Sequence, residues 1–241
     1  MKPNPILIFG ASGGIGRAIV ENIIKLKLPM ILTGRNKKEL LELEKKVSSQ
    51  GIFCKSFILD LAKKESIKKL AAALNKKSLS PNWIINAHGY IETAGNLVGQ
   101  DIEELESSFQ INFISNLYIM KFFLPFMVIE GGIINISSSA ALKPNGKYAV
   151  YSASKAALDA LSQAVATSIN FSENKNISIF SVCPGPTNTP MRKKISKDTA
   201  LAQDPKCITD IIDLIIQKKS NYKNGDIIIV KDCKEELVSS I

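Results

Sequence analysis

Tyr151 and Lys155 are the two side chains whose types and spacing most directly suggest proton chemistry. On a helix, residues four apart lie on one face, so the phenol and the ammonium would be neighbours. A free phenol has a pKa of about 10 and is a poor base at neutral pH, but a nearby ammonium favours the phenolate. The pair can therefore exchange a proton with a carbonyl or alcohol oxygen. The same spacing also arises by accident on amphipathic surface helices. The surrounding residues must therefore show whether the pair is catalytic.

Ser138 supplies that context. It stands thirteen residues before Tyr151, at the end of an apolar run that reads as a strand, and from there its hydroxyl can polarise the same oxygen. Ser137 and Ser139 are adjacent alternatives, but successive side chains of a strand point to opposite faces, which turns both away from the side that Ser138 faces. Ser138, Tyr151 and Lys155 together predict an acid/base site that acts on a carbon–oxygen bond.

A glycine-rich turn near the N-terminus predicts a phosphate-binding loop. The short run from Ile6 to Phe9 reads as a strand, and the spacing Gly10-x-x-x-Gly14-x-Gly16 follows it and opens a helical segment. Glycines allow backbone angles that other residues avoid, and the free amides and positive dipole end of the new helix attract a pyrophosphate. A plain tight turn is the alternative. The predicted cofactor contacts of this loop are Gly10, Ser12, Gly13, Gly14, Ile15 and Gly16.

These motifs resemble those of the short-chain dehydrogenase/reductase family, and the resemblance extends over residues 5–231. It implies an enzyme that reduces a carbonyl or oxidises an alcohol with a nicotinamide dinucleotide. By that resemblance Tyr151 is the general acid/base, Ser138 is the hydrogen-bond donor to the substrate oxygen, and Lys155 tunes Tyr151 and holds the nicotinamide ribose. The resemblance also makes Asn112 the fourth catalytic residue, which kinks its helix and holds a water that leads to the lysine.

Arg35 favours NADP(H) over NAD(H). It follows the second predicted strand, where an NAD-preferring site places a carboxylate on the ribose 2′-hydroxyl. The first acid after this strand is Glu39. A guanidinium pairs well with phosphate oxygens, and Ser12 or Arg17 can add donors. The alternative is that Arg35 is a surface residue at the start of the next helix.

The resemblance assigns further cofactor contacts at the ends of later strands. Asn-Asn-Ala-Gly is the usual family sequence after the fourth strand, and here Ala87 and His88 depart from it. We interpret His88 as a structural or cofactor-wall histidine rather than an acid or base. A Pro-Gly turn follows the sixth strand. The contacts implied in these segments are Asp60, Leu61, Asn86, Gly89, Pro184, Gly185, Thr187 and Thr189.

Alternating short apolar runs and longer helical patterns position these groups. We predict strands at Pro5–Phe9, Met30–Thr33, Phe53–Leu59, Trp83–Ala87, Gly132–Ser137, Ile177–Cys183 and Asp226–Val230. We predict helices at 15–27, 37–49, 63–77, 102–129, 151–170 and 206–219. This alternation is typical of an α/β fold with a parallel sheet whose carboxyl ends meet at one edge. The prediction is a Rossmann-type doubly wound parallel sheet of about seven strands with helices on both faces, forming one domain over residues 1–241.

Composition limits the other possibilities. No apolar run reaches the length of about 18 residues that a membrane span needs, and the N-terminal run does not read as a signal peptide, so we expect a cytoplasmic protein without membrane contact. The net charge of +9 comes from lysines spread over many segments, which indicates a solvated basic surface rather than a nucleic-acid site. The cysteines lack metal-ligand spacing and there is one histidine. We therefore expect reduced thiols and no metal at Cys54, Cys183, Cys207 and Cys233.

The substrate and the assembly are predicted only in outline. The segment Pro190–Pro205, where the family has its substrate lid, is short and carries several cations. Its length favours a small ketone, aldehyde or 3-oxoacyl group as substrate, and its cations favour an acidic or carrier-linked one. Family members often pair two long helices across a two-fold axis, so we expect a homodimer or homotetramer through apolar residues such as Phe113, Leu117, Leu158 and Leu161. The alternative functions are a non-catalytic NADP(H)-binding sensor or scaffold, a nucleic-acid-binding protein, and an epimerase or dehydratase on the same fold.

Overall fold

Short aliphatic runs form the strands of one sheet. The computed structural model describes residues 4–128, 130–169, 176–196 and 202–238. Its sheet has eight strands in the order β3-β2-β1-β4-β5-β6-β7-β8. Neighbouring strands are parallel except β8, which is antiparallel to β7. The strands are β1 (Ile6–Phe9), β2 (Met30–Gly34), β3 (Cys54–Ile58), β4 (Trp83–Asn86), β5 (Glu130–Ile136), β6 (Asn176–Pro184), β7 (Ile227–Lys231) and β8 (Lys234–Val238).

The sheet is buried on both faces because each strand sends alternate side chains to opposite sides. In β1, Ile6 and Ile8 belong to one core cluster and Leu7 and Phe9 to the other. All four are fully buried. This explains why the strands read as continuous apolar runs rather than as an alternation of apolar and polar residues.

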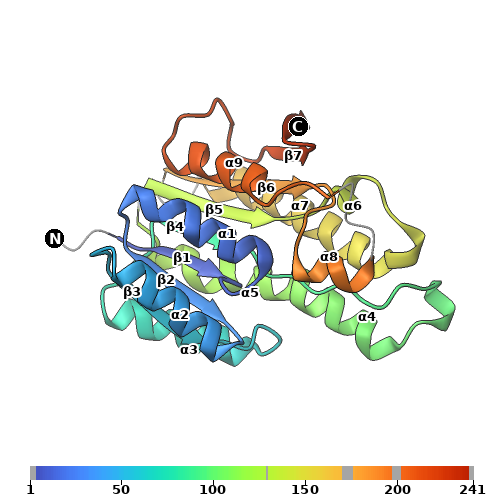
Figure 1. The fold of residues 1–241 in the computed structure, drawn as a ribbon, viewed down its shortest axis with the longest axis horizontal. Coiled ribbons are helices and arrows are strands. Elements are labelled where there is room, and N and C mark those ends of the chain that lie inside the picture. Colours follow the sequence, from blue (N-terminus) through green and yellow to red (C-terminus); the bar gives the residue numbers. More distant parts are fainter. Residues whose placement is uncertain (1–3, 129, 170–175, 197–201, 239–241) are drawn as a thin grey trace.

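Three helices cover each face. The first face carries α1 (Gly14–Ile23), α2 (Lys37–Ser48) and α9 (Lys206–Ile216), and α1 and α9 lie side by side (Figure 1). The second face carries α3 (Lys64–Lys76), α5 (Ser115–Phe123) and α7 (Ala149–Ile169). The remaining α-helices are α4 (Ile102–Phe109), α6 (Ser139–Leu142) and α8 (Pro190–Ile195).

The strand order reverses direction between β1 and β4. The chain runs outward from β1 to β3 and then returns to place β4 on the other side of β1. Ligands of such sheets bind at the carboxyl ends of the strands beside this reversal. The segments after the parallel strands β1 to β6, which hold most of the predicted site residues, therefore meet at one edge.

The predicted fold is confirmed, with one more strand than expected. All seven predicted strands are present within a few residues of their predicted ends. The eighth, β8, lies in the charged tail and forms by hairpin pairing, with Asp232 and Cys233 at positive φ in the turn. The short helices α6 and α8 were also not expected.

The prediction of one continuous helix over 102–129 is wrong. The structure divides it into α4, a π-helical turn at Gln110–Ile114, α5, and a 3-10 turn at Leu124–Phe126. Pro125 lies in the last turn, where it has no amide to donate to a continuing helix. The π-helical turn contains Asn112, whose side chain is hydrogen-bonded to the backbone of Tyr90.

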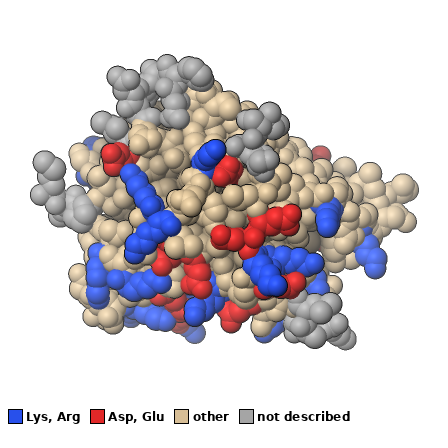
Figure 2. Space-filling model, turned by 90° about the horizontal axis from the view of Figure 1, so that it is seen from above, with Lys and Arg blue, Asp and Glu red and all other residues tan. Residues whose placement is uncertain are grey.

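Charged side chains of both signs share the surface. On the face shown in Figure 2, Lys and Arg are interspersed with Asp and Glu rather than gathered in one basic stripe. Surface ion pairs such as Lys46 with Glu21 and Lys25 with Asp213 belong to this pattern. Among the described residues, none of the helices combines the length and apolar character that a membrane crossing requires.

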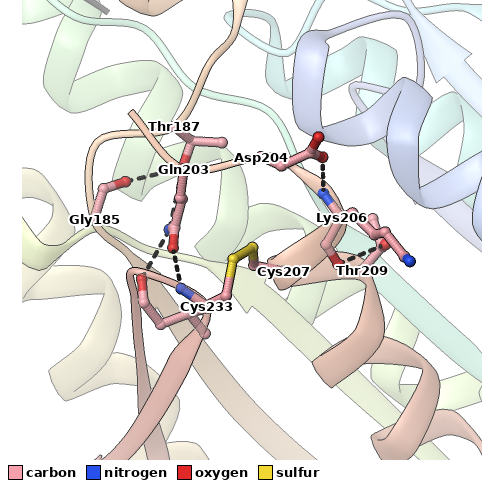
Figure 3. The surroundings of a disulfide bond; sticks show 9 residues. Gly185, Thr187, Gln203, Asp204, Lys206, Cys207, Thr209 and Cys233 are labelled. Atoms are coloured by element: carbon pink, nitrogen blue, oxygen red, sulfur yellow. Dashed lines mark hydrogen bonds between the residues drawn. A yellow bond between two sulfur atoms is a disulfide. The ribbon is translucent and has the colours of Figure 1, made fainter. Parts of the chain in front are cut away.

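The prediction of four reduced thiols is wrong for one pair. Cys207, at the start of α9, and Cys233, in the β7–β8 turn, form a disulfide with their Cα atoms 4.9 Å apart. Figure 3 shows this bond beside Gln203, whose side chain accepts from the Cys233 amide (3.3 Å) and donates to the Val230 carbonyl (2.8 Å). The pairing could not be predicted from the sequence, because it depends on the β7–β8 hairpin lying next to the start of α9. Cys54 and Cys183 are free and buried, as expected.

We predict that replacing both Cys207 and Cys233 by Ser lowers the free energy of unfolding by about 3 kcal/mol, because the disulfide closes a 26-residue segment and restricts the unfolded chain. Urea unfolding of the oxidised parent and the double variant measures the difference. Reductant should bring the parent to the variant's midpoint and leave the variant unchanged. Equal midpoints for the oxidised parent and the variant would show that the bond does not form in solution.

Candidate active site

The turn between β1 and α1 can be built only from glycine at its critical positions. Gly10 has a φ of +77°, and a Cβ there would stand 2.8 Å from the backbone of His88. A Cβ on Gly16 would stand 2.1 Å from the Gly10 carbonyl oxygen. The helix can therefore start directly above the end of the strand, with its first turn at the edge of the sheet.

The N-terminus of α1 is open to an anion. Its N-cap is Gly13, no side chain caps the first turn, and that turn holds no acidic residue. Free amides and a positive dipole end thus face the same side as the glycine turn, which is the arrangement that binds phosphate. The donor set fits the pyrophosphate of a dinucleotide.

A groove of about 800 Å³ runs along this edge of the sheet. This volume is ordinary for a cofactor or small-molecule site. The predicted cofactor residues that line it are Gly10, Ser12, Gly13, Gly14, Ile15, Arg35, Asp60, Leu61, Gly89 and Thr189. The predicted residues that do not line it are Gly16, Asn86, Tyr151, Lys155, Pro184, Gly185 and Thr187. Residues that sequence reasoning did not assign also line it, among them Gly34, Asn36, Ala87, Met191 and Lys194.

Basic side chains line the groove, and Arg35 lies at its end beside β2. Arg17, Arg35 and Lys194 all line it, and Arg35 is exposed and forms no ion pair within the part of the chain that the structure describes. Asp60 is engaged locally, since its carboxylate accepts from the Ala62 amide (3.1 Å) and lies 3.5 Å from the Lys63 ammonium. Free guanidinium donors at this end can take a phosphate group.

Ser138, Tyr151 and Lys155 come together where β5 ends beside the first turns of α7. The Ser138 hydroxyl lies close enough to the Tyr151 phenol to lower its pKa. The Lys155 ammonium lies 6.0 Å from the centre of the Tyr151 ring and donates to the Ile136 carbonyl at 2.8 Å. Ser137 points away, as strand alternation predicts, and its hydroxyl lies 3.4 Å from the Lys155 carbonyl. The structure thus gathers the predicted acid/base group.

Burial governs the protonation of this group. It raises the pKa of Tyr151; the hydrogen bond from Ser138 lowers the pKa and the Glu92 carboxylate raises it further. Burial also lowers the pKa of Lys155 to about 8, against an opposing effect of Asp159. Tyr151 therefore holds its proton at neutral pH, ready to donate it. The phenolate expected beside an ammonium is not favoured here, because desolvation of the phenol is the largest influence.

Gly89 connects the groove to the buried lysine. It lines the groove, and a Cβ on it would lie 3.8 Å from the Lys155 ammonium and 3.4 Å from the Asn112 amide oxygen. Because glycine leaves this space empty, the ammonium lies next to the groove although it does not line it. A ribose hydroxyl in the groove would be within reach of both side chains.

Asn112 holds the π-helical turn through backbone groups of another segment. Its amide oxygen accepts from the Tyr90 N–H at 2.9 Å, and its amide nitrogen donates to the Tyr90 carbonyl at 2.7 Å. Its own carbonyl accepts from the Asn116 side chain at 2.7 Å. These bonds to a distant loop explain why the helix widens here. The water that the resemblance places between Asn112 and the lysine stays a prediction.

The side chains of Asn86 and His88 both contact other side chains of the protein. Asn86 donates to Asn135 at 2.7 Å between β4 and β5, which keeps it below the groove. His88 lines the groove, and its Nε2 lies 2.8 Å from the Ser115 hydroxyl and 3.2 Å from the Asn116 amide nitrogen. Burial lowers the pKa of His88 to about 3. An imidazole that stays neutral across the physiological range agrees with a wall residue.

The segment that follows the Pro-Gly turn lines the groove through Asn188, Thr189 and Pro190. Thr189 caps α8 by accepting from the Arg192 amide at 3.2 Å, and a Cβ on Gly14 would stand 2.7 Å from the Thr189 Cβ. The two loops therefore touch. Thr187 is buried behind them, hydrogen-bonded to Gly185 (2.9 Å) and to Gln203 (3.4 Å). Sequence reasoning missed Gln203, which ties this turn to the β7–β8 hairpin.

The sequence profile of the short chain dehydrogenase family matches residues 4–200. The chain belongs to this family. Short-chain dehydrogenases are oxidoreductases, and this enzyme acts on the alcohol–carbonyl pair with a nicotinamide cofactor.

Three relatives illustrate the match. An uncharacterized oxidoreductase of Staphylococcus saprophyticus is 26% identical over 226 residues, which cover 92% of this chain and 95% of the relative. The human 3-oxoacyl-acyl-carrier-protein reductase is 28% identical over 231 residues, which cover 92% of this chain and 94% of that protein. A short-chain dehydrogenase from Shigella flexneri, solved in complex with NADP, superimposes with a TM-score of 0.85 at 23% identity over 95% of this chain and 97% of that one.

We predict that Lys155→Met makes the dehydrogenase more stable at pH 7, by about 2 kcal/mol. The pKa of Lys155 in the folded protein is about 8, below its ordinary value of 10.5. The penalty of burying the ammonium is thus fully present below pH 8 and fades as the pH rises toward 10.5. Urea unfolding of parent and variant at pH 7 and pH 10 measures this, and the gap should shrink at pH 10. A stability difference between parent and variant that does not change with pH would contradict the lowered pKa of Lys155.

Proposed function

We propose that this short-chain dehydrogenase reduces a small ketone, aldehyde or 3-oxoacyl group to an alcohol with NADPH, and catalyses the reverse oxidation with NADP⁺. The observation that carries the proposal is the convergence of Ser138, Tyr151 and the buried Lys155 ammonium, whose nitrogen lies 6.0 Å from the centre of the Tyr151 ring. An alternative location for acid/base chemistry beside the groove would be His88, whose pKa of about 3 makes it unsuitable.

Each residue of the group has a role in the proposal. The bound nicotinamide supplies or accepts the hydride. Tyr151 gives its proton to the carbonyl oxygen, and its raised pKa keeps that proton available at neutral pH. Ser138 donates a hydrogen bond to the same oxygen as negative charge develops on it. Lys155 offers a positive charge to the tyrosine and to the cofactor ribose through the space left by Gly89. Asn112 holds the loop that carries Gly89 and Tyr90.

NADP(H) is preferred over NAD(H) in this proposal because Arg35 is free to pair with a 2′-phosphate. Arg17 and Lys194 also line the groove and add positive charge to it. Glu39 lines the groove too, but its carboxylate accepts from the Asn36 side chain at 2.9 Å. The Shigella flexneri neighbour was solved with NADP, which agrees with this preference.

The substrate class follows from the lid and from one relative. The helix α8 starts the segment Pro190–Pro205, and its exposed residues Lys193 and Lys194 give it positive charge. Residues 197–201 lie outside the described part of the chain. A basic edge suits an acidic or carrier-linked acyl group, and the name of the human relative specifies a 3-oxoacyl substrate on a carrier protein.

Location and assembly remain proposals. We place the enzyme in the cytoplasm and expect a homodimer or homotetramer. Phe113, Leu117 and Leu161 are only half-buried within one chain and are available to a second copy, whereas Leu158 is 1% exposed and belongs to the protomer's own interior.

We predict that Tyr151→Phe lowers kcat for NADPH-dependent carbonyl reduction by roughly 10²- to 10⁴-fold, because the general acid is lost while the ring remains. The rate of NADPH consumption with a panel of small ketones, aldehydes and 3-oxoacyl thioesters measures the loss. Tyr148→Phe, which alters a half-buried tyrosine three residues away, is the matched control and should keep the parental rate. Parental activity of Tyr151→Phe would overturn the mechanism. NADPH binding without turnover of any compound by the parent would favour the sensor alternative.

We predict that Arg35→Gln weakens NADPH binding by roughly 10- to 100-fold and leaves NADH binding nearly unchanged, because only the phosphorylated ribose uses the guanidinium. Fluorescence titration with both cofactors gives the dissociation constants. Lys38→Gln removes an exposed charge that does not line the groove and serves as the control. An equal loss for both cofactors would show that Arg35 does not read the phosphate.

A further inference from the structure

The loop after β4 carries a carboxylate that has no contact with solvent. Glu92 is 0% exposed. Acidic side chains are almost never fully buried unless their oxygens are paired, because removing an ion from water is costly. Nothing in the reading of the sequence assigned a role to this residue, so its partners define what it does.

Those partners form a closed ring of hydrogen bonds that includes two proposed catalytic residues. One Glu92 oxygen accepts from the Tyr151 backbone N–H at 2.9 Å, and the other accepts from the Ser108 hydroxyl at 2.8 Å. The Asn112 amide nitrogen lies 3.3 Å from the Ser108 hydroxyl and 3.0 Å from the Ser154 hydroxyl. Ser154 closes the ring by donating to the Tyr151 carbonyl at 2.8 Å.

The ring acts at the start of α7. The first amides of a helix have no intrahelical acceptor, and an anion near them is favoured by the helix dipole. Helix α7 begins at Ala149, so the Tyr151 amide belongs to its first turn. Glu92 therefore caps this helix from a distant loop, at the residue whose phenol faces Ser138. Ser108, Asn112 and Ser154 are each 0% exposed, so water cannot replace these bonds.

We propose that Glu92 is a positioning residue of the active site, whose carboxylate fixes the backbone of Tyr151 and thereby the direction of its phenol. The proposal rests on the proposed function in one respect, that Tyr151 is the general acid. The backbone capping itself does not depend on the reaction.

The charge of Glu92 adds an electrostatic effect. After burial, the Glu92 and Cys183 groups raise the pKa of Tyr151, and the Ser138 hydrogen bond lowers it. The other charged or titratable groups near the phenol are Lys155 on the same helix, beside the ring, and Asp159 one turn further on. Replacing Glu92 by Gln removes a negative charge near the phenol and keeps the shape of the side chain in the hydrogen-bond ring. The Glu92 carboxylate favours the protonated phenol, which is the form that carbonyl reduction requires.

Two substitutions separate position from charge. Glu92→Gln keeps an oxygen for the Tyr151 amide and removes the charge, so we expect kcat near the parental value at neutral pH, with the basic limb of the pH profile moved to lower pH. Glu92→Ala removes the acceptor, and we expect kcat to fall roughly 10- to 100-fold, as a lost buried hydrogen bond to a charged group implies. The affinity for NADPH should stay the same in both, because Glu92 does not line the groove.

Hydrogen exchange of the cofactor-free protein gives an independent reading. The Tyr151 amide should exchange faster in Glu92→Ala than in the parent and in Glu92→Gln. The matched control is Glu104→Gln, which alters a carboxylate that binds the neighbouring Thr93 (2.9 Å to its amide) and should move neither the pH profile nor this amide.

The outcomes distinguish this proposal from the proposed function. Parental kcat and parental Tyr151 exchange in Glu92→Ala would overturn it, as would an unchanged pH profile in Glu92→Gln. A parallel loss of NADPH affinity and kcat in Glu92→Ala would reduce Glu92 to a folding role and would also overturn it. If Glu92→Ala does not fold, the pH profile of Glu92→Gln decides. Full activity of Tyr151→Phe would instead refute the proposed function, whatever Glu92 does.

Discussion

The hydrogen bond from the Lys155 ammonium to the Ile136 carbonyl joins helix α7 to the end of β5, and the active site depends on it. The strands around it are almost entirely aliphatic, so a buried ammonium is tolerated only because a main-chain oxygen receives it. The bond ties the first turns of α7 to the carboxyl end of β5. Tyr151, one turn earlier on the helix, thereby meets Ser138, two residues beyond the strand's last carbonyl.

Features that depend on local spacing could be predicted from the sequence. The glycine turn needs only neighbouring residues, since Gly10 and Gly16 approach each other within one loop. The four-residue spacing of Tyr151 and Lys155 fixes their common face in the same way. The Thr189-Pro190 pair was a further local signal for helix α8, because threonine is a frequent N-cap and proline a frequent first helical residue.

Features that depend on distant partners could not be predicted. The π-helical turn exists because Asn112 bonds to the backbone of Tyr90, and nothing near Asn112 in the sequence announces this. In the sequence, Glu92 is a loop glutamate like any other, because its partners Ser108 of α4 and Tyr151 of α7 are distant along the chain. The Cys207–Cys233 bond likewise appears only after β8 has paired with β7. In each case the decisive contact joins segments that only tertiary packing brings together.

The two edges of the sheet also differ from its interior in what they offer to other chains. At one edge, β8 presents Lys234, Glu235 and Glu236 to solvent. At the other, the Ser56 amide of β3 is already bound by Glu44 at 2.8 Å. Mixed charge and a blocked amide both discourage the addition of a further strand. Both edges therefore oppose the lateral addition of strands, which protects a chain with so many isoleucine-rich strands against ordered aggregation.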